Sequence, residues 1–113
     1  MNLSRRGPEM TTFDDRENAF EAKFAHDEEM KFKAEARRNK LVGLWAAGLL
    51  GKSDEEAAAY AKEVIAADFQ EAGEEDVFRK LSSDLGAKSD AATIRAKMAE
   101  LMVEAKRQLM NEA

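Results

Sequence analysis

A short run near the middle of the chain has the residue types that bind phosphate groups. Residues 46–53 read AAGLLGKS, which places Gly51, Lys52 and Ser53 in the order used by phosphate-binding loops. In those loops backbone N–H groups and the lysine bind phosphates, and the hydroxyl binds Mg²⁺. Ala46 stands where the first glycine belongs, and the apolar run before it predicts a helix where such loops follow a strand. We therefore expect no catalytic residue, while weak ADP or ATP binding at these three residues stays an open alternative, because Lys52 lies beside a predicted helix amino end.

No metal site is expected. His26 is the only histidine of the chain, and its neighbours Asp27, Glu28 and Glu29 would have to supply the other ligands. A solvated histidine explains this pattern more simply. Without cysteine the chain has no disulfide and no thiolate metal site, which fits a reducing compartment. We expect a cytoplasmic protein that has no cofactor and is not an enzyme.

Composition narrows the classes of partner. The 113 residues carry a formal net charge of −5, and a chain of this length has room for one domain. A net negative field repels phosphate backbones and anionic lipids, so we expect neither nucleic-acid binding nor membrane insertion. Leu41–Leu50 is apolar but only about half as long as a bilayer crossing requires. A basic group is interpreted as a solvated helix face, and it consists of Lys31, Lys33, Arg37, Arg38 and Lys40.

Glycines and capping residues divide the chain into four predicted helices. Residues 1–11 lack periodicity and are expected to be a disordered lead-in to a single helical domain over 12–113. One long helix is predicted from Thr12 to about Leu50, and a capping box at Ser53 begins a second, which runs to about Ala72. A short third helix ends at Gly86, and Ser89 caps the last. The expected fold is an all-α four-helix bundle with a long, partly protruding N-terminal helix. The predicted core stripes are Met30, Ala34, Leu41, Trp45 and Leu49 in the first helix, Val77, Phe78, Leu81 and Leu85 in the third, and Ile94, Met98, Leu101, Ala105 and Leu109 in the last.

A separate aromatic face occupies the front of the first predicted helix. Phe13, Phe20 and Phe24 recur at helical spacing, but the positions that continue this face from Asp27 onward are charged. Either the rings pack onto the bundle as ordinary core, or residues 12–28 form an arm that lies in a groove of another protein while residues 29–113 form the bundle. Three rings worth about 1.5–3 kcal/mol each do not reliably exceed an association cost of about 4–15 kcal/mol, so charge pairs must contribute. The residues expected to contact the partner are Phe13, Asp14, Asp15, Arg16, Glu17, Phe20, Glu21, Lys23 and Phe24.

Several stretches of the chain resemble a known family. They are MTTFDDRE at 10–17, EAKFAHD at 21–27, KFKAEARRN at 31–39, LWAAGLLG at 44–51, DVFRK at 76–80 and IRAKM at 94–98. The chain is similar over about residues 10–109 to the bacterial zeta subunits, which are natural inhibitors of the F1-ATPase. Residues 1–9 precede the usual start of that family.

The resemblance implies a function and a set of partners. It implies a four-helix inhibitor subunit whose N-terminal segment, here Met10 to about Glu28, enters a catalytic interface of F1 and blocks rotation during ATP hydrolysis. The implied partners are the alpha, beta and gamma subunits, and the implied location is at the inner membrane through the ATP synthase. We expect the protein itself to be a monomer. The alternative from another class is a helical interaction module with weak adenine-nucleotide binding and no inhibitory role.

Overall fold

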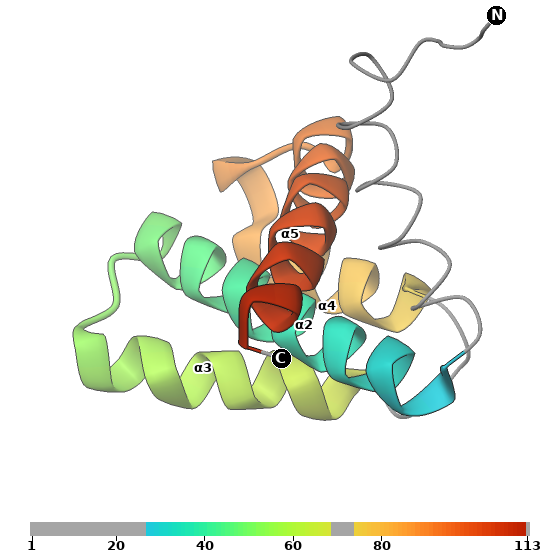
Figure 1. Ribbon diagram of the computed structural model, residues 1–113. Helices are drawn as coiled ribbons and strands as arrows, with labels where there is room; N and C mark the ends of the chain where they lie inside the picture. Colours follow the sequence, from blue (N-terminus) through green and yellow to red (C-terminus); the bar gives the residue numbers. More distant parts are fainter. Residues whose placement is uncertain (1–26, 69–73, 113) are drawn as a thin grey trace, which may run out of the picture.

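The computed structural model describes residues 27–68 and 74–112 of the chain. Within these ranges it contains helices and turns but no strand, which confirms the predicted all-α class (Figure 1). A one-turn 3₁₀ helix, η1, joins the third and fourth of the described α-helices. The elements are α2 (Glu28–Leu49), α3 (Asp54–Ala67), α4 (Glu75–Leu85), η1 (Gly86–Lys88) and α5 (Ala91–Glu112).

Asp27 starts α2. Its backbone is extended, with φ −117° and ψ 102°, and its carboxylate accepts a hydrogen bond of 3.1 Å from the Met30 N–H. An aspartate in this position satisfies one of the unpaired N–H groups of the first turn, so it begins a helix. The prediction of one uninterrupted helix from Thr12 to Leu50 is therefore wrong at Asp27. The part of that prediction before Asp27 lies outside the described residues.

Small side chains let α2 approach α3 closely. Gly43, Ala46 and Ala47 are all buried, and a Cβ atom on Gly43 would lie 2.9 Å from the Ala61 Cα. After the turn at Gly51, which has φ +73°, α3 runs back beside α2, and α5 also packs on α2 (Figure 1). Helix α2 is thus the element that the other described helices share.

The core-facing stripe predicted for α2 is correct only in part. Ala34 is buried, but Trp45 and Met30 are only partly buried, and Leu49 is 40% exposed. The prediction placed the largest apolar side chains inward. The observed face turns alanine and glycine inward, because close packing of helix backbones favours small residues over large ones.

The remaining helices follow their predicted caps and stripes closely. In α3 the Ser53 hydroxyl accepts from the Glu56 N–H at 3.2 Å and the Glu56 carboxylate accepts from the Ser53 N–H at 3.0 Å, which confirms the capping box. Helix α3 ends at Ala67, earlier than predicted. Gly86 ends α4 as predicted, whereas the first turn of α5 is capped by Asp90, which accepts from the Thr93 N–H at 2.8 Å, and not by Ser89.

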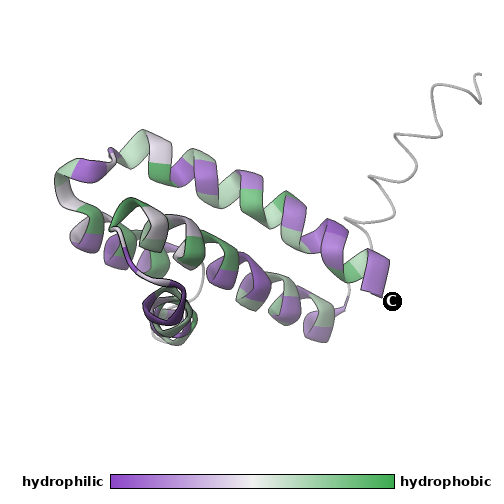
Figure 2. Cartoon of the chain, turned by 90° about the vertical axis from the view of Figure 1, so that its left-hand side faces the viewer, coloured by the Kyte–Doolittle hydropathy of each residue, from purple (hydrophilic) through white to green (hydrophobic). Residues whose placement is uncertain are grey.

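All four helices contribute to one main core, and each carries both apolar and polar stretches, as amphipathic helices do (Figure 2). The stripe predicted for α5 is confirmed, since Ile94, Met98 and Ala105 are fully buried and Leu109 nearly so. The main core consists of Val42, Ala46, Ala47, Tyr60, Val64, Val77, Leu81, Leu85, Ile94 and Met98. No helix in the described ranges is both long and apolar enough to cross a membrane.

Candidate functional site

The residues predicted to contact a partner all precede Asp27 and lie outside the described residues. The nearest described structure is the first half of α2, residues 28–40, which we call the arm root. The arm root follows the predicted arm directly in the chain, so its contacts set the place at which the described bundle meets that segment.

A small apolar cluster holds the arm root against α5. Ala34 and Leu109 are buried at its centre, and three methionines pack around them: Met30, Met102 and Met110. Unbranched methionine side chains adapt to irregular gaps, which suits a contact near two helix ends. Met30, Met102 and Met110 are only partly buried.

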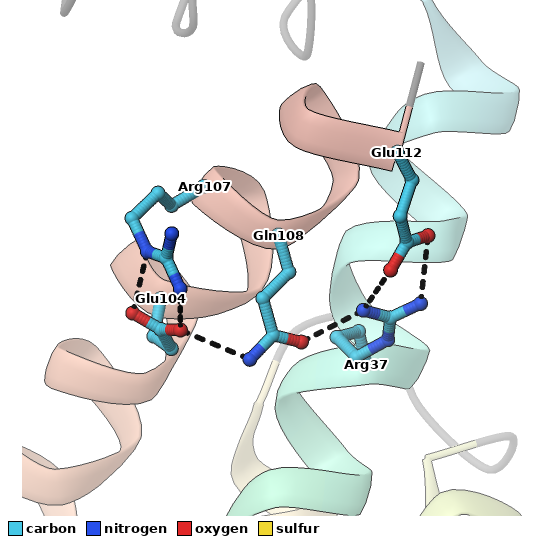
Figure 3. Close-up of polar contacts among 5 residues, drawn as sticks. All are labelled: Arg37, Glu104, Arg107, Gln108 and Glu112. Carbon is cyan, nitrogen blue, oxygen red and sulfur yellow. Dashed lines mark hydrogen bonds and ion pairs between the residues drawn. The ribbon is translucent and has the colours of Figure 1, made fainter.

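Polar contacts add a second connection between the arm root and α5 (Figure 3). The Arg37 guanidinium donates to both carboxylate oxygens of Glu112, at 2.7 and 3.1 Å, and to Gln108 Oε1 at 2.7 Å. This bidentate hydrogen bonding raises the pKa of Arg37 and lowers the pKa of Glu112. Gln108 in turn donates to Glu104, which also accepts from Arg107. The last three turns of α5 thus form one connected polar network with α2.

Two buried polar residues form a third connection, which the sequence did not reveal. Arg38 is 3% exposed and Asn39 is 1% exposed. The Arg38 Nε donates to Asn39 Oδ1 at 2.7 Å, and Asn39 Nδ2 donates to Asp68 Oδ2 at 3.0 Å. Arg38 also pairs with Glu74 at 3.4 Å. The prediction that Arg38 lies on a solvated basic face is wrong, because its side chain is buried and pairs with Asn39 and with Glu74 at the start of α4.

The only hint of this network in the sequence is weak. Asparagine is an unfavourable residue in a helix interior, since its side chain competes for backbone hydrogen bonds. A glycine-free helical run that nevertheless contains Asn39 suggests a specific polar partner. Nothing in the sequence identifies Asp68 as that partner, because it is 29 residues away.

A groove opens beside the arm root, where α2, α3 and α5 meet. Ala36, Ile65 and Leu109 line it with apolar atoms, one from each helix. Charged side chains form its rim, and these are Lys33, Arg37, Lys40 and Glu112. Phe32 is 58% exposed and borders a second, smaller pocket, which shares Ala36 and Ile65 with the groove.

The predicted nucleotide-binding residues lie at the turn between α2 and α3. Gly51, Lys52 and Ser53 are exposed, and the Ser53 N–H donates to the Glu56 carboxylate and not to open solvent. Asp54, Glu55 and Glu56 also place three acids in the first turn of α3. Negative charges at this position repel phosphate, so the local electrostatics weigh against the site. Nucleotide binding here stays a prediction that no observation on the described residues supports.

Comparison with known proteins identifies the family of this chain. The model of the ATPase inhibitor subunit zeta family matches residues 10–108. The chain belongs to this family. A structure solved by NMR in solution is 62% identical, with a TM-score of 0.70, and the match covers 74% of this chain and 99% of that one. No curated protein matches significantly. The family match confirms the resemblance seen in the sequence and extends over the predicted arm, the arm root and the groove residues up to Ile65, but not Leu109 and Glu112.

Membership of the zeta family gives the chain a general role as an ATPase inhibitor. An inhibitor subunit is a regulatory protein that associates with an ATPase.

Proposed function

We propose that residues 10–27 form the inhibitory segment, which inserts into a catalytic interface of a bacterial F1-ATPase and blocks ATP hydrolysis. The observation that carries this proposal is the position of two boundaries. The family match begins at residue 10, whereas α2 begins at Glu28 behind its own N-cap. The family therefore includes a segment ahead of the described bundle, and that segment holds Phe13, Phe20 and Phe24.

The chemistry of this segment suits a protein groove. Its aromatic residues supply apolar area, and acids and bases flank them, so the segment offers both anchors and charge pairs. The charged residues that flank the phenylalanines in the sequence are Asp14, Asp15, Arg16, Glu17, Glu21 and Lys23. We expect contacts with the alpha, beta and gamma subunits of F1, with the chain acting as a monomer at the cytoplasmic side of the inner membrane.

The mechanism is a change in the barrier to rotation. A catalytic interface of a rotary ATPase opens and closes during turnover, and a segment that binds one state adds its binding free energy to the cost of leaving that state. Residues 28–40 link the segment to α5 through Arg37 and to α3 and α4 through Asn39 and Arg38. The bundle then acts as a bulky stop outside the interface.

Hydrolysis of ATP by the cognate F1 tests this proposal. Deleting residues 1–24 should abolish inhibition, and the triple substitution of Phe13, Phe20 and Phe24 to alanine should raise the half-inhibitory concentration at least tenfold. Phe32→Ala is the matched control, because it removes an exposed phenylalanine from α2 beyond Asp27 and should leave inhibition unchanged. Full inhibition by the deletion variant would remove the segment from the mechanism.

A further inference from the structure

The groove between α2, α3 and α5 is positively charged in a chain that is negative overall. Three cationic side chains line it against the single carboxylate of Glu112, while the whole chain carries a net charge of −5. Lys33, Arg37 and Lys40 lie four and three residues apart, so they share one face of α2. A local excess of positive charge on a protein that is negative overall favours the binding of an acidic ligand at that surface.

Two of the three cations are available to a ligand. Arg37 is held by Glu112 and Gln108, so it fixes the centre of the groove. Among the residues that the structure describes, Lys33 pairs only with Glu29, at 3.5 Å, and both side chains are more than half exposed, which makes this a weak and exchangeable pair. Lys40 is exposed and has no ion pair within 4 Å among residues 27–68 and 74–112.

The floor of the groove is apolar, which sets it apart from an ordinary solvated charged face. Ala36 and Ile65 are partly exposed there, and Leu109 closes the bottom. A ligand that only neutralised charge would leave this floor in contact with water. A ligand with an apolar side chain between two carboxylates would cover it and pair with both lysines.

We propose that this groove is a second docking surface, which binds an acidic amphipathic segment of the ATPase that the chain inhibits. The two lysines are seven residues apart on α2, which corresponds to about 10 Å along the helix axis. A partner helix with carboxylates at positions i and i+7 and a small apolar residue between them matches this spacing. The negative charge of the chain and the carboxylate of Glu112 disfavour nucleic acid, whose phosphates follow one another closely.

The position of the groove makes such a contact effective, and in this respect the inference rests on the proposed function. Lys33 lies six residues beyond Asp27, about 9 Å along the helix. A partner that binds residues 10–27 would therefore have its own surface next to the groove. Once the first contact has formed, the second is intramolecular and lengthens the residence time without a new encounter.

Charge reversal in the full-length chain tests the inference. Lys33→Glu with Lys40→Glu should raise the half-inhibitory concentration for the cognate F1 about tenfold, equivalent to about 1.4 kcal/mol, and speed dissociation. The matched control is Lys62→Glu with Lys88→Glu, which changes net charge equally at exposed lysines outside the groove lining and should shift the concentration less than twofold. Equal shifts in both double variants, or none in either, would overturn the groove as a docking surface.

Two further measurements separate this inference from its alternatives. If the groove variant lost retention on heparin while its affinity for F1 stayed unchanged, the surface would bind polyanions and the inference would be wrong. The groove variant and its control are also compared in the chain that lacks residues 1–24, by direct binding to F1. Inhibition that survives the deletion contradicts the proposed function, whereas a difference in binding that persists between Lys33/Lys40 and Lys62/Lys88 variants still supports the groove.

Discussion

Gly43 offers the sharpest test of how α2 and α3 pack. A Cβ atom at this position would lie 2.9 Å from the Ala61 Cα and 3.3 Å from both the Ala61 Cβ and the Val64 Cγ2. The nearest of these atoms is backbone, which cannot move aside without shifting α3. Gly43→Ala is therefore expected to force the two helices apart at the centre of their interface.

Gly48 provides a matched control in the same helix. A Cβ atom there would meet nothing within 4 Å. Replacing glycine by alanine in a helix gains about 0.8–1.0 kcal/mol, somewhat less near a helix end, so Gly48→Ala should stabilise the protein by about 0.5–1 kcal/mol. Gly43→Ala gains the same helix propensity but adds an overpacking cost of about 1–3 kcal/mol, so we expect a net loss of about 1 kcal/mol.

Thermal unfolding followed by far-ultraviolet circular dichroism measures the difference. The two variants should differ by about 2 kcal/mol, which for a domain of this size corresponds to roughly 8–16 °C in Tm, with Gly48→Ala above the unsubstituted protein and Gly43→Ala below it. If Gly43→Ala proved as stable as Gly48→Ala, the helices would not be in close backbone contact and the account of α2 given above would be refuted.

Two further predictions concern the polar networks of the bundle. Asn39→Leu removes the partner of both the Arg38 Nε and Asp68 Oδ2, and at about 1–3 kcal/mol for each buried group left unpaired it should cost about 2–6 kcal/mol in urea unfolding; a loss below about 0.5 kcal/mol would contradict the network. Hydrogen bonds from Arg107 and Gln108 lower the pKa of Glu104 to about 2, so the stability that this carboxylate contributes should be present above its ordinary pKa of 4.5 and fade as the pH falls through about 2. Titration by NMR should show that low pKa in the native protein and a return toward 4.5 in Arg107→Gln, whereas an ordinary value in the native protein would rule the pairing out.

Local signals in the sequence were enough to predict the end of α2, the start of α3 and the end of α4. The capping box at Ser53 and the glycines at 51 and 86 act within a few residues of themselves, so they can be recognised without the fold. The α5 stripe is confirmed for the same reason, because its face is continuous along one helix. The start of α2 at Asp27 was not predicted. Its capping role is local, but helix-favouring residues on both sides of it favoured one continuous helix.

The interior of α2 could not be predicted in this way. Whether a helix turns alanine or leucine inward depends on how closely its neighbours approach, and that distance is a property of the whole fold. Arg38 pairs with Glu74, which lies 36 residues away in the sequence. A contact between residues so far apart cannot be read from the local sequence pattern. The predicted partner contacts of Phe13, Phe20 and Phe24 stay predictions, since they fall outside the described residues.

Three consecutive residues of α2 contact three different helices or their caps. Arg37 pairs with Glu112 of α5, Arg38 pairs with Glu74 at the start of α4, and Asn39 donates to Asp68 at the end of α3. Successive side chains on a helix point about 100° apart, so the three contacts together fix the rotation of α2 about its own axis.

Apolar contacts alone would not fix this rotation. An interface built from alanine and glycine tolerates small rotations, whereas hydrogen bonds lose their geometry quickly when a donor turns away from its acceptor. A rotation of α2 by a fraction of a turn would strain all three polar contacts at once. Helix α2 thus keeps one orientation in the bundle, which fixes the position of Asp27, the described residue next to the segment proposed to bind the ATPase.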